Sequence, residues 1–266
     1  MRARLVVFPI RGRIWCFSRS ADPSVSVSEA SSQATTFKEL RENVSISGKS
    51  FSANAELLVD FVANKMNKAW IGLEKAPEGS FKNKVHGLGL RLLSRVKPSE
   101  IFLRSITKDI TRVEVIYPSS LDARLVRRRL RHVAMRGTII HKKYLYGSVS
   151  MLPLTSSLAV LPMPNVPFFW NLFRAYSHWR ALQGSERLFR LVSDSSINKK
   201  EIEQKDSRSE NHNSPEPYWV LKPSVELESL ARRDEDEDGL SQTAIKRICK
   251  IYDLDTNDVI KYRKLG

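Results

Sequence analysis

The chain has 266 residues, and its 44 Lys and Arg against 29 Asp and Glu give a formal net charge of +15 at pH 7. Two cysteines, Cys16 and Cys249, and five scattered histidines exclude a disulfide framework and a cysteine-rich zinc module. The length allows one or two domains with a sizeable core. The basic balance is typical of chains that meet nucleic acid, anionic lipid or acidic proteins, and charge alone does not choose among them.

The first twenty residues are rich in arginine and contain no acid, and serine and threonine are frequent from there to Thr36. This composition is typical of an organelle transit peptide, while the apolar run Leu5–Phe8 is too short for a secretory signal. We therefore expect residues 1–50 to be a transit peptide and a disordered linker that direct the protein to the mitochondrion, with the chloroplast as the alternative. The other interpretation is a disordered basic tail.

Apolar residues then recur at three- and four-residue steps, which predicts successive amphipathic helices. They begin near Ser52, at Ser80, whose side chain can serve as an N-cap, and at Pro98. The alternating, β-branched stretch Val113–Tyr117 predicts one short strand.

A basic helix is predicted from Pro118 to Met135, with Gly137 as its stop. We interpret its arginine-rich face either as a solvated surface, which charge runs usually are, or as a docking face for phosphate groups. The candidate lipid- or phosphate-binding residues in and beyond this helix are Arg124, Arg127, Arg128, Arg131, Lys142, Lys143, Arg174 and Arg180.

Between Lys143 and Arg174 the chain carries no charged side chain. A membrane-spanning helix needs about 20 predominantly apolar residues, and prolines such as Pro153 divide this segment into shorter pieces. A short span, a re-entrant hairpin, an interfacial helix and a buried core hairpin all remain open. A further helix is expected from Asn165 to about Val192, with Pro167 in its first turn. The candidate membrane-contact residues are Tyr144, Leu152, Leu161, Phe169, Trp170 and Phe173.

The remaining chain is polar from 194 to 239 and predicts a disordered linker that ends in a run of acids. A short helical hairpin is expected at 240–266, because apolar residues from Ala244 to Cys249 fall on one helical face. The expected fold class is therefore mainly α. It comprises a helical core at 51–193 with at most one short strand or hairpin, a proline-broken apolar segment at 144–173, and disordered termini and linker.

Motifs for catalysis are missing from the sequence: it has no phosphate-binding loop, dinucleotide fingerprint, nucleophile elbow or metal-binding His-x-x-x-His helix. His132, His141 and His178 lie in the basic region, where a lone histidine is more often a surface or core residue than a catalyst. An enzyme needs a nucleophile, an acid or a metal in defined company. We therefore expect no enzymatic activity, no catalytic residue, no metal site and no cofactor.

Several short motifs stand out between Tyr117 and Leu188. They are Tyr117-Pro118, Leu125-Val126-Arg127-Arg128-Arg129-Leu130, His141-Lys142-Lys143-Tyr144, Pro153-Leu154-Thr155, the residues from Leu161 to Pro167, and the residues from Phe173 to Ser185. These motifs resemble those of the mitochondrial potassium–proton exchange-related family, and the whole chain looks like a plant member of it. The resemblance implies a part in the electroneutral exchange of potassium for protons across the mitochondrial inner membrane. It assigns no site residue, because these motifs carry no known chemistry.

A proton-coupled exchanger usually places a titratable carboxylate at membrane depth, and residues 144–173 contain none. Transporters also need several spans, whereas this sequence offers at most one or two. We therefore expect an accessory or assembly factor associated with the inner membrane or anionic lipid, not the carrier itself. Were it a carrier, His141 and His178 would be the first candidates for its proton site.

Two other function classes remain. The basic helix together with the aromatic-rich stretch 168–179 would suit an organellar RNA-binding module, although no recognised RNA-binding signature is present. A structural subunit of a mitochondrial complex is the third interpretation.

Overall fold

The computed structural model describes residues 1–21, 61, 68, 70–157, 166–193, 218–232, 235–236 and 239–264. The chain divides into two compact units, one formed by residues 1–21 with 97–266 and the other by residues 22–96. In the second unit, helix α4 (Phe81–Leu93) begins at Ser80, whose hydroxyl accepts a hydrogen bond from the backbone N–H of Lys82 at 3.1 Å. This confirms the predicted N-cap.

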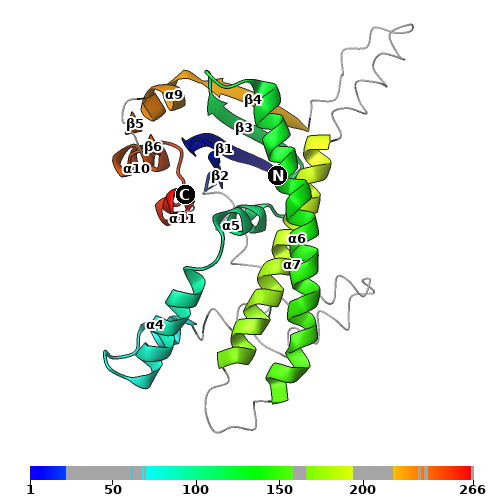
Figure 1. The fold of residues 1–266 in the computed structure, drawn as a ribbon, viewed down its shortest axis with the longest axis vertical. Coiled ribbons are helices and arrows are strands. Elements are labelled where there is room, and N and C mark those ends of the chain that lie inside the picture. Colours follow the sequence, from blue (N-terminus) through cyan, green and yellow to red (C-terminus); the bar gives the residue numbers. More distant parts are fainter. Residues whose placement is uncertain are drawn as a thin grey trace, which may run out of the picture. The chain divides into compact units, whose positions relative to one another are not determined.

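The first unit is built around a four-stranded sheet with the strand order β2-β1-β3-β4 (Figure 1). Strands β1 (Arg2–Arg11) and β2 (Ile14–Arg19) form an antiparallel hairpin, and Gly12 adopts a positive φ of 47° in its turn. β3 (Arg112–Pro118) pairs in parallel with β1, and β4 (Trp219–Ser224) pairs in parallel with β3. The strand that starts the chain is therefore an interior strand of the sheet.

This arrangement corrects two predictions for the amino terminus. Leu5 and Val7 are completely buried in the core on one face of β1, and Val6 and Phe8 are completely buried in the core on the other. A continuous apolar run is what a strand covered on both faces requires. The prediction of disorder is thus wrong for residues 2–19, and so is the limit of one short strand or hairpin. A targeting role for residues 1–50 stays a prediction, and residues 22–50 lie outside the described part.

Helices cover both faces of the sheet, which makes three layers. One face carries α5 (Pro98–Ser105), α6 (Ala123–Ser157) and α7 (Val166–Ser193), which contribute Leu103, Leu130 and Leu188 to the first core. The other carries α9 (Val225–Arg232), α10 (Gln242–Ile251) and α11 (Thr256–Arg263), which contribute Leu227, Ile245 and Val259 to the second core. A two-stranded sheet, β5 (Glu235–Asp236) with β6 (Gly239–Leu240), lies just before α10. Mainly α remains a fair description, and the two tail helices lie where helices were predicted. The prediction of a disordered linker over 194–239 is wrong where β4 and α9 form, and residues 194–217 lie outside the described part.

Helices α6 and α7 form a long antiparallel hairpin (Figure 1). Hydrogen bonds between the two helices join Arg127 with Val192, His141 with His178, and Asn171 with Ser148. From one pair to the next, the residue numbers rise along α6 and fall along α7 by the same amount, first by fourteen and then by seven. Seven residues is the repeat of helices packed along a coiled-coil seam. With 35 residues, α6 is about 52 Å long at the usual rise of an α-helix.

The length of α6 corrects the prediction that its basic helix stops at Gly137. The helix continues past Gly137 and through Pro153. Gly137 is instead a point of close approach, since a Cβ there would lie 2.5 Å from Cδ1 of Leu103 and 2.6 Å from Oγ of Ser185. Throughout the described residues, no helix combines the length and the apolar character needed to span a membrane.

Candidate functional site

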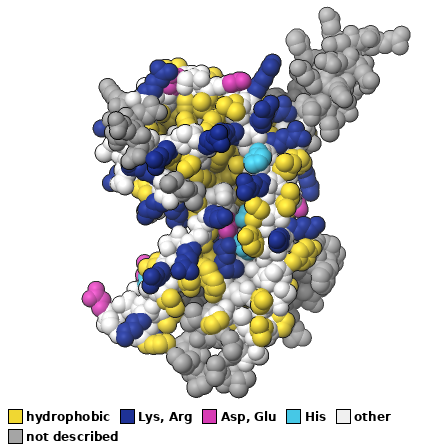
Figure 2. Space-filling model, in the orientation of Figure 1, with side chains coloured by type: hydrophobic (Ala, Val, Ile, Leu, Met, Phe, Trp, Pro, Cys, Tyr) yellow, Lys and Arg dark blue, Asp and Glu magenta, His cyan; other side chains and the backbone are white. Residues whose placement is uncertain are grey.

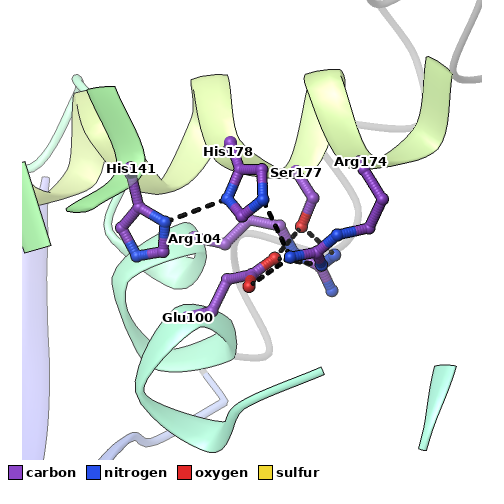
Figure 3. Close-up of polar contacts among 6 residues, drawn as sticks. All are labelled: Glu100, Arg104, His141, Arg174, Ser177 and His178. Carbon is purple, nitrogen blue, oxygen red and sulfur yellow. Dashed lines mark hydrogen bonds and ion pairs between the residues drawn. The ribbon is translucent and has the colours of Figure 1, made fainter. Parts of the chain in front are cut away.

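A carboxylate is buried where α5 meets the α6–α7 hairpin (Figure 3). Glu100 is only 4% exposed, and its carboxylate receives a two-pronged ion pair from Arg174, with Nη1 2.8 Å from Oε1 and Nη2 3.1 Å from Oε2. The Ser177 hydroxyl donates to the same Oε1 at 2.6 Å. A buried charge is tolerated only when it is paired and hydrogen-bonded in this way.

Two histidines extend this network from α7 into α6. The Arg174 Nη2 atom also lies 2.8 Å from Nε2 of His178, and Nδ1 of His178 lies 3.1 Å from Nδ1 of His141. A guanidinium can only donate, so Nε2 of His178 accepts and its proton, in the neutral ring, is on Nδ1. His178 therefore donates to His141, whose own proton is on Nε2. We call Glu100, His141, Arg174, Ser177 and His178 the Glu100 cluster.

The sequence positions these side chains through ordinary helix geometry. Glu100 stands in the first turn of α5, where the helix dipole favours a carboxylate. Arg174, Ser177 and His178 are spaced by three and four residues, which places them on one face of α7. The ring of Tyr144, one turn beyond His141 on α6, stacks on His178 with centroids 5.3 Å apart and an interplanar angle of 24°. Three helices thus hold one polar cluster.

The electrostatics of the cluster keep both imidazoles neutral. Burial and the neighbouring Arg174 charge lower the pKa of His178 from 6.5 to about 4, against the opposing influence of Glu100. Burial likewise lowers the pKa of His141. Burial alone would raise the pKa of Glu100, but hydrogen bonds from Arg174 and Ser177 outweigh it, so this pKa falls below its usual 4.5. The stable state near neutral pH is an ionised Glu100 with two neutral histidines.

The same residues have the chemistry of a metal site. One ligand atom from each of Glu100, His141 and His178 lies within 4.8 Å of the other two, and all three residues are buried. Sequence reasoning singled out His141 and His178 but missed Glu100, because nothing local shows that the first turn of α5 lies against α7. The spacing of Arg174, Ser177 and His178 was the available signal, since it puts three polar side chains on one face of the helix.

The basic candidates do not form one free surface. Arg174 is half-buried and paired with Glu100, and lipid or phosphate binding by it stays a prediction. Arg127 donates to the carbonyl of Val192 at 3.3 Å, and its guanidinium lies 4.7 Å from the ring centre of Trp219. It therefore links α6 to α7 and to β4. Arg131 lies 5.6 Å from the ring centre of Phe189, with its side chain at the surface. Arg180 is half-buried, and the exposed candidates are Arg124, Arg128, Arg131, Lys142 and Lys143.

The membrane-contact candidates gather at the far end of the hairpin. We define the hairpin tip as residues 142–157 of α6 and 167–173 of α7. No side chain from 142 to 157 is buried, so the interpretation of this stretch as a buried core hairpin is wrong. Tyr144 and Phe169 are exposed, Leu152, Trp170 and Phe173 are half-buried, and Leu161 lies outside the described residues. The exposed large apolar residues of the tip are Tyr144, Tyr146, Val149, Met151, Leu154 and Phe169, and Figure 2 shows apolar side chains on this end of the molecule.

One protein family and two relatives match this chain, and the family match includes the hairpin and the Glu100 cluster. A family model described as mitochondrial K+-H+ exchange-related matches residues 4–192, a range that runs from β1 to the end of α7 and includes the whole Glu100 cluster. An uncharacterized protein of Schizosaccharomyces pombe is 33% identical over 155 residues, which is 54% of this chain and 67% of the relative. An uncharacterized protein of Saccharomyces cerevisiae is 29% identical over 174 residues, which is 52% of this chain and 53% of the relative. No solved structure matches the chain.

Proposed function

The chain belongs to the mitochondrial K+-H+ exchange-related family, and on that premise we propose that it serves potassium–proton exchange as an accessory protein that binds the inner-membrane surface through its hairpin tip. The observation that carries this proposal is the run of exposed apolar side chains on the tip. Contiguous apolar patches of this kind are rare on soluble monomers and commonly mark a protein or membrane contact.

The charge pattern favours a lipid surface as the occupant. Lys142 and Lys143 are exposed immediately before Tyr144, and the rest of the tip is uncharged. Basic residues beside an apolar, aromatic-bearing helix suit the boundary between lipid headgroups and acyl chains. Each basic residue near an anionic surface contributes about 1 kcal/mol to binding. The tip thus combines apolar contact with attraction to anionic lipid.

The Glu100 cluster supports an accessory role over that of a carrier. A group that takes up and releases a proton in every cycle works best with a pKa near the ambient pH. Instead, burial and then the Arg174 charge lower the pKa of His178, and hydrogen bonds from Arg174 and Ser177 lower the pKa of Glu100, so each group is held in one protonation state. They also tie three helices together through their hydrogen bonds, which a protein that must cycle its protons would have to break repeatedly.

Flotation of the purified full-length protein with vesicles tests the membrane contact. We expect binding to vesicles that contain cardiolipin, weaker binding to neutral phosphatidylcholine vesicles, and loss of binding in the triple variant Tyr146→Ser, Met151→Ser, Leu154→Ser. These side chains are 66%, 52% and 64% exposed, so the variant should fold normally. The double variant Val225→Ser, Ile251→Ser is the matched control, because it removes apolar residues that are 74% and 49% exposed on α9 and α10.

Two results would contradict the proposal. The first is equal flotation of the triple variant and the wild-type protein. The second is that neither the wild-type protein nor the triple variant binds vesicles, while the wild-type protein binds single-stranded RNA in a salt-sensitive way. That result would favour the nucleic-acid interpretation.

A further inference from the structure

We propose that Glu100, His141 and His178 form a binding site for a divalent transition-metal ion such as Zn2+, for which Arg174 is the built-in competitor. This inference concerns the middle of the hairpin, where α5 packs against it, and does not depend on membrane binding by the tip.

The first argument is geometric. Two nitrogen ligands at the usual zinc distance of about 2.0–2.1 Å and a tetrahedral angle lie roughly 3.3–3.4 Å apart. The Nδ1 atoms of His141 and His178 are 3.1 Å apart and already face each other, so the pair needs only a slight opening to share an ion. The Glu100 ligand atom completes a set within 4.8 Å. In the structure the Glu100 carboxylate points toward Arg174, so ligation requires its side chain to rotate toward the histidines (Figure 3).

The second argument concerns protonation. Metal ligation requires neutral imidazoles and an ionised carboxylate, and burial and the neighbouring charges place the three residues in those forms near neutral pH. His178 carries its proton on Nδ1 while Nε2 accepts from Arg174. Once the guanidinium leaves Nε2, the proton can move from Nδ1 to Nε2. This frees the Nδ1 lone pair for the ion without net release of a proton.

The third argument is the support around the ligands. Ser177 donates to Glu100, and the ring of Tyr144 stacks on His178, so both ligands are oriented by neighbours. Such outer contacts commonly strengthen metal sites by 10- to 100-fold. Two imidazoles with one carboxylate suit zinc, copper, nickel or cobalt and disfavour magnesium and calcium, which prefer oxygen ligands.

Arg174 makes the proposal sharply testable. Its guanidinium holds both oxygens of Glu100 and one nitrogen of His178, so it must withdraw before an ion can bind. The side chain is 22% exposed, which gives it a route to solvent. Exchanging a guanidinium for a metal ion keeps a cation beside the carboxylate. Arg174 and the metal therefore compete, whereas a purely structural network would lose stability without gaining any affinity when Arg174 is removed.

The experiment is a calorimetric titration of ZnCl2 into purified full-length protein that has been stripped with a chelator, paired with absorption spectra of the Co2+ form. We expect one ion per chain for the wild-type protein. The variant Arg174→Met should bind Zn2+ at least about tenfold more tightly, and Glu100→Gln and His178→Ala should bind at least about tenfold more weakly. Visible cobalt bands without thiolate charge-transfer absorption would place the ion on nitrogen and oxygen ligands, away from Cys16 and Cys249.

The matched control is His132→Ala, which removes an exposed histidine from the same helix α6 and should leave affinity unchanged. Circular dichroism and thermal melts establish which variants are folded, and Glu100→Gln nearly preserves the side-chain shape in case His178→Ala does not fold. The proposal is overturned if Arg174→Met binds no more tightly than the wild-type protein. It is equally overturned if Glu100→Gln binds as the wild-type protein does, or if only His132→Ala loses binding.

Discussion

The Nδ1 atoms of His141 and His178 lie 3.1 Å apart and join two helices across 37 residues of sequence. This contact stands midway along the α6–α7 hairpin, and the other nitrogen of His178 is tied through Arg174 to Glu100 on α5. The hairpin is therefore held against α5 at its middle, while its tip carries exposed apolar side chains. Stability of the middle part and binding at the tip can be tested separately.

The histidine pair predicts a pH-dependent stability in chelator-containing buffer. The charged groups facing His178 and His141 are Glu100 in α5, Lys97 at the start of α5 and Arg174 on α7. Since the folded pKa of His178 is about 4 and the unfolded value is 6.5, the unfolded chain binds more protons between these values. The free energy of unfolding should be unaffected by His178 above pH 6.5 and fall on the order of 1–3 kcal/mol as pH drops from 6.5 toward 4.

Urea unfolding at a series of pH values measures this effect. Substitution His178→Gln should flatten the dependence in that window, and His132→Ala, at an exposed position, should not. An identical pH profile for His178→Gln and the wild-type protein would show that the buried pair does not contribute.

A second prediction concerns the approach of α7 to α5. A Cβ at Gly184 would collide with the backbone carbonyl oxygens of Leu103 and Ile106. Backbone cannot yield as a flexible side chain can, so Gly184→Ala should lower the free energy of unfolding by about 1–3 kcal/mol or more. Gly147→Ala on α6 is the control, because nothing lies within 4 Å of its added methyl and alanine is the better helix former. Denaturant titration of both variants measures their free energies of unfolding. Equal stabilities would contradict the close packing of α7 against α5 at Gly184.

A third prediction concerns the amino-terminal strand. Leu5 is completely buried on β1, so Leu5→Ala should cost about 2–5 kcal/mol. Arg13→Ala, at an exposed position in the β1–β2 turn, should cost little. Removal of residues 2–20 deletes the interior strand and should yield a protein without a cooperative thermal transition. A shortened chain that melts like the full-length protein would contradict the assignment of β1 to the core.

The helices were largely predictable because their signals are local. Ser80 caps α4, Pro98 begins α5, and the strand at Val113–Tyr117 falls within β3, as repeating apolar spacing and helix-start residues indicated. The amino-terminal hairpin was missed because Leu5–Phe8 has no alternation, and its parallel partner β3 lies about a hundred residues later in the chain. The arginines whose composition indicates a targeting signal lie in β1, in β2 and in the turn between them, so composition alone did not reveal these strands.

Of the Glu100 cluster, the two histidines could be singled out from the local sequence, whereas the carboxylate could not. His141 and His178 stood out as histidines at the edges of an uncharged segment, and the motifs around them are those that resemble the family. Glu100 did not stand out, because its importance depends on the packing of α5 against α7. Gly137 was read as a helix stop, since a glycine that ends a helix and one that lets another helix approach look alike in sequence.

Potassium-acetate swelling of isolated mitochondria tests the central claim most directly. Mitochondria without this protein should show reduced potassium-dependent swelling, and the full-length protein should restore it. The triple variant Tyr146→Ser, Met151→Ser, Leu154→Ser should fail to restore it, while the control variant Val225→Ser, Ile251→Ser should succeed. Normal swelling in the absence of the protein, or full restoration by the triple variant, would contradict an accessory role exerted through the hairpin tip.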